Sequence, residues 1–98
     1  MILHTVNKSP HASDALESCL GVAGQGDTIL LIEDGIYAAL DKGKFAKLLQ
    51  QTAATILVLA PDASARGMEG ALIDSIDTVD YAGFVTLTTN HQRVISWY

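Results

Sequence analysis

The apolar residues of this chain fall into two patterns, continuous runs and repeats at three- or four-residue spacing. The continuous runs at residues 28–32 and 55–59 are typical of strands buried on both faces of a parallel sheet. Shorter β-rich segments at residues 2–6, 77–80 and 93–97 predict three further strands.

Helical segments separate these predicted strands. The first helix is expected to begin at Ser9-Pro10 or at Ser13-Asp14, since both pairs suit a helix start. Its apolar positions share one face and are Ala12, Leu16, Cys19, Leu20 and Ala23. Further helical segments are predicted at residues 36–40, 45–54, 63–66 and 81–89.

This alternation of strands and helices predicts the fold class. Right-handed crossovers between successive strands give a parallel sheet with helices on both faces. We expect one α/β domain over residues 1–98, a three-layer α/β/α arrangement with a five-stranded, mostly parallel sheet.

Composition adds an expectation about the surface. Hydrophobic residues make up 49% of the 98 residues, and charged residues make up 17%. Soluble domains average about a quarter charged residues, and small domains have much surface to cover. We therefore expect another subunit to cover part of the apolar surface.

The charge argues against nucleic acid as a direct ligand. The net charge is −5, and the six cations are scattered, whereas phosphate binding needs clustered Lys and Arg. No apolar run approaches the roughly 20 residues that span a bilayer, so no membrane segment is expected. The N-terminal segment is too short and too polar for a signal peptide, which predicts a cytoplasmic location.

Cys19 is the single cysteine, and it lies within the first predicted helix. It has no partner for an internal disulfide or for a thiolate metal cage. Nothing nearby in the sequence activates it, because no cation is adjacent and the position is late in the helix. The residue is either a small core hydrophobe or a thiol used one sulfur at a time.

Glu33 and Asp34 follow the most apolar strand and could act as acid and base. The alternative is that Asp34 caps a helix beginning near Ile36. The three histidines form no i, i+4 pair, so we expect no metal and no cofactor. His4, in the first strand, is expected to be a core or sheet-edge histidine.

Aromatic residues gather towards the end of the chain: Tyr81, Phe84, Trp97 and Tyr98. Large aromatics on a terminal strand often mark an interface. The alternative is that Trp97 caps the core of its own domain.

Residues 2–10 (ILHTVNKSP), 30–39 (LLIEDGIYAA), 65–67 (ARG), 80–88 (DYAGFVTLT) and the closing Trp97 form a recognisable set that runs from end to end of the chain. In these segments the chain resembles the DsrH/TusB family. The resemblance implies the DsrE/DsrF/DsrH-like fold. It also implies a subunit of a cytoplasmic sulfur-relay complex, a dimer of heterotrimers built with DsrE/TusD-like and DsrF/TusC-like subunits.

In this family the complex carries sulfur as a cysteine persulfide to an acceptor of the DsrC/TusE type. The Tus branch delivers the sulfur to 2-thiouridine at the wobble position of tRNA. The Dsr branch serves sulfur oxidation through reverse dissimilatory sulfite reductase. The main persulfide carrier is a cysteine of the DsrE/TusD-like subunit, which lies on a different chain.

DsrH-type members carry a cysteine in the first helix, and many TusB-type members lack it. Cys19 therefore resembles the DsrH pattern and is the candidate catalytic residue, an auxiliary persulfide site. A second hypothesis is a purely structural subunit in which Cys19 is a core residue. A third is a stand-alone ligand-binding or hydrolytic α/β domain that uses Glu33 and Asp34.

Overall fold

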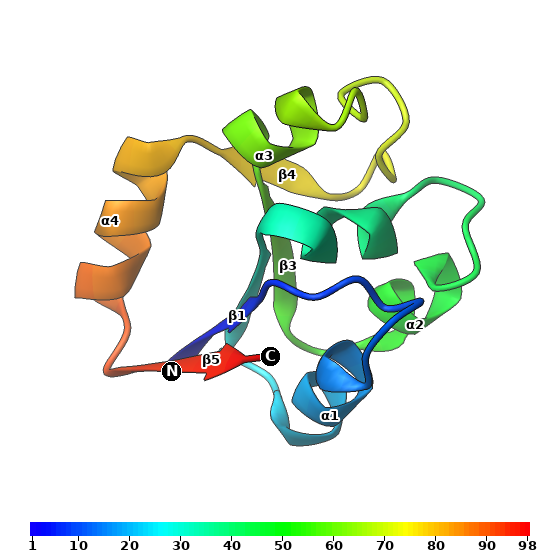
Figure 1. Ribbon diagram of the computed structural model, residues 1–98. Coiled ribbons are helices and arrows are strands. Elements are labelled where there is room, and N and C mark those ends of the chain that lie inside the picture. The colour runs from blue at the N-terminus through cyan, green and yellow to red at the C-terminus, as the bar shows by residue number, and fades with distance from the viewer.

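The computed structural model describes all residues from Met1 to Tyr98 and contains one five-stranded sheet (Figure 1). Its strands are β1 (Ile2–Val6), β2 (Thr28–Leu31), β3 (Thr55–Leu59), β4 (Asp77–Val79) and β5 (Arg93–Trp97). Its helices are α1 (Ala15–Val22), the 3-10 helix η1 (Glu33–Ala39), α2 (Ala46–Gln51), α3 (Ala60–Ala65) and α4 (Tyr81–Asn90). All four strand pairings are parallel, so the predicted fold class is confirmed.

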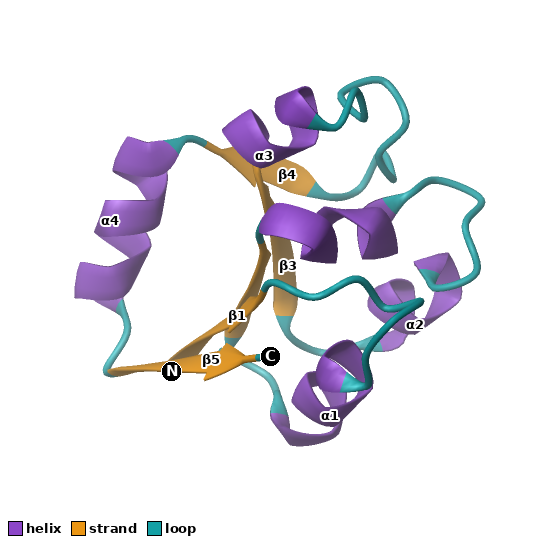
Figure 2. Cartoon of the chain, viewed as in Figure 1, coloured by secondary structure: helices purple, strands orange, loops and turns teal.

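The strand order β4-β3-β2-β1-β5 explains how the layers form. The chain steps from β1 to β4 in one direction, and then crosses the sheet to place β5 on the free side of β1. That last crossing carries α4, which lies alone on one side of the sheet in Figure 2, while the other helices lie on the opposite side.

The main core lies between the sheet and the larger group of helices. Strand side chains pointing to this face include Ile29, Leu31, Ile56 and Val58, all fully or almost fully buried. They alternate with side chains on the other face, as strand geometry requires. The core therefore sits on the face that carries α1, η1, α2 and α3.

A smaller cluster lies under α4, where Leu3, Leu30 and Leu59 are buried against Phe84 and Leu87. No residue of α4 is itself fully buried. The helix begins at Asp80, whose carboxylate accepts a hydrogen bond from the Gly83 amide at 2.7 Å. One lightly packed helix thus forms the whole second layer.

The first helix starts later than its earliest predicted position. It begins at Ala15, after Asp14, so the Ser13-Asp14 start is confirmed and the Ser9-Pro10 start is wrong. The Ala12 amide bonds to the Ser9 carbonyl in a turn, which places Ala12 before the helix and off its apolar face.

Three other helix boundaries also differ from prediction. The segment predicted at 45–54 is helical only from Ala46 to Gln51, because Thr52 is extended and its hydroxyl accepts the Ala54 amide. The helix predicted at 63–66 already begins at Ala60, with Pro61 in its first turn, where its missing N–H costs nothing. The helix predicted at 36–40 is the 3-10 helix η1.

Candidate functional site: a buried thiol and a histidine network

Helix α1 turns Cys19 into the core. Ala15, Leu16 and Cys19 are its buried residues, and their three- and four-residue spacing places them on one helix face. The Cys19 side chain has no exposed surface. The thiol is enclosed by the protein's own packing.

Its surroundings also hold the thiol protonated. Burial, and to a lesser extent the negative charge of Asp27, together raise the pKa of Cys19 to about 12. At pH 7 a thiol with this pKa is ionised in only about one molecule in 10⁵. Because the thiolate is the nucleophile in sulfur exchange, both the burial and the raised pKa disfavour reaction at Cys19.

His4 lies close to this region and is completely buried. Its Nε2 is 2.9 Å from Asp27 Oδ2, and the Trp97 indole donates to its Nδ1 at 3.1 Å. An indole N–H can only donate, so Nδ1 must accept and the ring proton must sit on Nε2. Trp97 therefore fixes the neutral tautomer that donates to Asp27.

Asp27 joins three parts of the fold. Beyond His4, its carboxylate accepts the Ile2 amide at 3.0 Å and the Gly24 amide at 3.3 Å. These hydrogen bonds lower the pKa of Asp27, with the one from His4 having the largest influence. The carboxylate ties the start of β1 to the end of α1 and, through His4 and Trp97, to β5.

The sequence predicted part of this network. His4 is the buried, satisfied histidine that was expected. Trp97 packs against the main core and bonds to His4, as the capping alternative predicted, while Tyr98 beyond it is 83% exposed. Asp27 was missed. It could have been sought from His4, because a histidine in the core needs a polar partner.

Glu33 and Asp34 lie at the carboxyl edge of the sheet, where their surroundings are structural. Arg66 donates from Nε at 3.1 Å and from Nη2 at 3.0 Å to the same oxygen of Asp34. The Glu33 backbone amide donates to the Asp62 carboxylate at 2.6 Å. Glu33 and Asp34 thus belong to a loop cluster that also contains Asp62 and Arg66. The sequence did not predict that Asp62 and Arg66 lie beside them.

The predicted capping role of Asp34 is wrong. Helix η1 begins at Glu33, its N-cap is Ile32, and no side chain caps it. Asp34 lies inside the first turn, where a carboxylate suits the positive end of a helix. A close approach sets this start, because a Cβ on Gly35 would lie 2.2 Å from the Val6 carbonyl oxygen.

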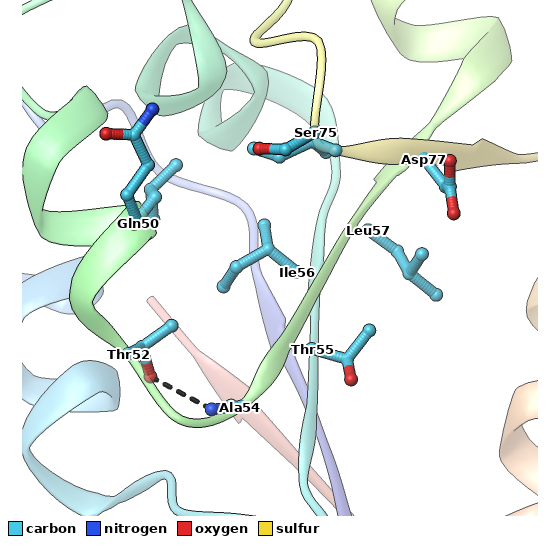
Figure 3. Close-up of a pocket in the computed structure, with 10 residues that line it drawn as sticks. Gln50, Thr52, Ala54, Thr55, Ile56, Leu57, Ser75 and Asp77 are labelled. Carbon is cyan, nitrogen blue, oxygen red and sulfur yellow. Dashed lines mark hydrogen bonds between the residues drawn. The ribbon is translucent and has the colours of Figure 1, made fainter.

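Two cavities are present, and neither is lined by Glu33 or Asp34. The larger, about 300 Å³, lies between the end of α2 and the start of β3 (Figure 3). Its polar lining consists of Gln50, Thr52, Thr55, Ser75 and Asp77. The smaller, about 250 Å³, lies between α3 and β4. The third hypothesis requires a pocket at Glu33 and Asp34, and neither cavity lies there.

No three His, Cys, Asp or Glu side chains gather closely enough to hold a metal ion. No helix has the length and apolar character that a membrane crossing requires.

Comparison with known sequences decides the family. The profile of the family described as "DsrH like protein" matches residues 8–94. This chain belongs to the DsrH-like family. The match includes Cys19, Asp27 and the Glu33–Arg66 loop cluster, and it leaves His4 and Trp97 outside.

Curated relatives of this DsrH-like chain are named Protein TusB. Those of Enterobacter sp. (strain 638), Klebsiella pneumoniae (strain 342) and Yersinia pestis (strain Pestoides F) are each 40% identical to it over 96 residues. Each alignment covers 98% of this chain and 100% of the relative. The resemblance to the DsrH/TusB family is confirmed over the full length.

Solved structures support the fold of the DsrH-like chain at low identity. The ychN protein from E. coli superposes with a TM-score of 0.82 at 18% identity, covering 97% of both chains. MTH1491 from Methanobacterium thermoautotrophicum gives 0.72 at 12% identity, covering 97% of this chain and 96% of that one. Likenesses at this level of identity establish the architecture alone.

Proposed function

We propose that this DsrH-like chain is a non-autonomous subunit of a cytoplasmic sulfur-relay complex. Its partners in the complex are DsrE/TusD-like and DsrF/TusC-like subunits, and the sulfur passes to a DsrC/TusE-like acceptor. Family membership and the full-length identity to TusB proteins support this proposal. The low surface charge also fits a chain that is partly covered by other subunits.

The relatives favour one branch of the family. All of those described above are TusB proteins, at 40% identity over the full length. Cys19 alone resembles the DsrH pattern, but one residue weighs less than a full-length match. We therefore assign the complex to thiolation of the wobble uridine of tRNA, with sulfur oxidation as the alternative.

Within the complex, Cys19 is a core residue and does not carry sulfur. The observation behind this assignment is the complete burial of the thiol, which also raises its pKa to about 12. To hold sulfur as a persulfide, a thiolate must reach the outer sulfur of a donor persulfide and displace the donor thiolate. Cys19 lacks both the ionised form and a path to a donor.

The test replaces the chain in its own cells with the Cys19→Ala variant and measures 2-thiouridine in tRNA by mass spectrometry. We expect thiolation within about two-fold of wild type, since alanine removes only a buried sulfur, whereas deleting the chain should abolish it. Native mass spectrometry of the purified complex serves as the control for assembly.

Two results would contradict parts of this proposal separately. Loss of thiolation in an assembled Cys19→Ala complex, with extra sulfur mass on the wild-type chain, would make Cys19 a carrier. Normal thiolation in the deletion strain would overturn the tRNA assignment and direct attention to sulfur oxidation.

A further inference from the structure

The larger cavity marks a place where the sheet is incomplete. Strand β3 begins at Thr55, but its pairing with β4 begins only at Leu57↔Asp77. The chain before β4 is instead folded into a turn, in which the Ile76 amide donates to the Ile73 carbonyl at 3.1 Å. The first part of β3 therefore has no neighbouring strand on this side. The cavity of about 300 Å³ lies in this gap, which we call the β3 notch.

Two backbone groups of β3 and the residue before it point into the notch. The Thr55 amide donates to the Asp27 carbonyl at 3.0 Å, on the side of β2. Because a trans peptide is planar, the Ala54 carbonyl of the same peptide bond points the opposite way, into the notch. Backbone groups alternate between the two edges of a strand, so the Ile56 amide points there too.

The register of the neighbouring strands gives the same result. The Ile32 amide donates to the Val6 carbonyl, so Ile32 faces β1 and the alternation turns Ile29 towards β3. Ile29 lies opposite Ile56, and in a parallel ladder such a residue bonds to the two neighbours of its partner. Both neighbours of Ile56 therefore face β2, and Ile56 itself faces the notch.

The Ile56 amide and the Ala54 carbonyl are both left without a partner. No hydrogen bond joins either group to another group of the chain. Ile56 is only 9% exposed and Ala54 only 8%. Backbone groups in such positions are paired in the great majority of cases, with protein, with water or with a ligand. An unpaired donor beside an unpaired acceptor at a cavity therefore indicates a place where an outside group binds.

The spacing of the two groups selects for a planar ligand. A donor and an acceptor side by side on one strand edge are complemented by a group that carries an acceptor next to a donor in one plane, as the amino edge of adenine or cytosine does. Apolar side chains flank that plane, because Leu57 packs with the cluster under α4 and Ile76 packs against the main core (Figure 3). The notch therefore suits a flat ring lying in the plane of the sheet.

The lining of the notch disfavours an anion. Its one charged residue is Asp77, and no Lys, Arg or His lines it. A phosphate would meet this negative charge with no cation to offset it. The hydroxyls of Thr55 and Ser75 can donate or accept, and the volume is at the small end of the range for ligand sites. These features fit a neutral base or nucleoside, and not a nucleotide or a nucleic-acid strand.

We propose that the β3 notch binds a neutral nucleobase or nucleoside, whose ring acceptor takes the Ile56 amide and whose amino group donates to the Ala54 carbonyl. The notch lies at the amino ends of β3 and β4, the opposite edge of the sheet from the Glu33–Arg66 loop cluster. This site goes beyond the sulfur-relay assignment and does not depend on it.

The test titrates adenosine and cytidine into the ¹⁵N-labelled full chain and follows the backbone amides by NMR. We expect at least one of them to bind with a dissociation constant below about 1 mM, with the largest shift at the Ile56 amide. Analogues dimethylated on the amino nitrogen should bind at least about ten-fold more weakly, because they leave the Ala54 carbonyl without a donor. No saturable shift with either nucleoside, or equal binding of the dimethylated analogues, would overturn the proposal.

Two further measurements locate the site. In the free chain the Ile56 amide should exchange its hydrogen much faster than the Leu57 amide, which the register pairs with β2, and the bound nucleoside should slow it. Ser75→Tyr places a large side chain at the notch and should weaken binding about ten-fold or more. Thr86→Tyr, at an exposed position of α4, is the matched control and should leave binding unchanged. The same spectra report whether each variant is folded. Slow exchange of the Ile56 amide in the free chain, or unchanged binding in folded Ser75→Tyr, would contradict the site.

Discussion

The hydrogen bond from Trp97 to His4 predicts how the fold responds to the substitution Asp27→Asn. Because the indole can only donate, His4 must carry its proton on Nε2, and residue 27 must accept it. Asp27→Asn is nearly isosteric but can present an amide N–H₂ where Oδ2 now accepts. His4 cannot respond by moving its proton to Nδ1, because that nitrogen already faces a donor.

The structure sets the scale of the effect. Hydrogen bonds to charged groups contribute roughly 1.5–3 kcal/mol, and an unsatisfied buried donor costs about 1–3 kcal/mol. We therefore expect Asp27→Asn to lower the free energy of unfolding by about 2–4 kcal/mol. That is a large part of the roughly 5–15 kcal/mol typical of a domain of this size.

The double variant isolates the mechanism. Trp97→Phe removes the donor that fixes the tautomer, so His4 can then place its proton on Nδ1 and accept from the asparagine amide. The combined loss should be smaller than the sum of the two single losses by about 1 kcal/mol, the value of one regained hydrogen bond. Urea unfolding followed by far-UV circular dichroism measures all four proteins. Strictly additive losses, or an Asp27→Asn loss below about 0.5 kcal/mol, would refute the tautomer argument.

The structure makes two further predictions about the stability of the fold. Because the folded state lowers the pKa of Asp27 below the unfolded value of 3.8, its contribution to stability is present above that value and is lost as pH falls through the folded pKa. Urea unfolding between pH 6 and pH 2 should show a steeper loss for wild type than for Asp27→Asn, and parallel profiles would contradict the assignment. Gly35→Ala should destabilise the fold by about 3 kcal/mol or more, because the new Cβ would meet the Val6 carbonyl oxygen at 2.2 Å. Gly70→Ala, where a Cβ meets nothing within 4 Å, is its matched control, and equal stabilities of the two variants would contradict the reasoning.

The strands were the most predictable part of the fold. Residues 2–6, 55–59 and 93–97 match the observed strands, and the other two differ by one residue at an end. Strands can be predicted locally, because the apolar pattern that indicates burial on one or both faces lies in consecutive residues. Helix boundaries were less predictable, since they depend on contacts such as the close approach of Gly35 to Val6, which joins residues far apart in sequence.

The candidate site was less predictable for the same reason. Cys19 could be placed on an apolar helix face, but its burial depends on how the helix packs against the sheet. The His4–Asp27–Trp97 network joins positions 23 and 93 residues from the histidine, and no spacing rule connects them. Arg66 was visible only as part of a family motif, and the structure gives it a partner in Asp34.

Strand β5 shows how the register of one short strand decides what each of its residues does. Its side chains alternate between the two faces of the sheet, and its backbone groups alternate between its two edges. Trp97 lies opposite Val6 in the ladder with β1, on the face of the main core, and its indole donates to His4 Nδ1 at 3.1 Å. Of the two alternatives for the aromatic end of the chain, the core cap is therefore the one that Trp97 fulfils, and the exposed Tyr98 beyond it is the residue that an interface would still use.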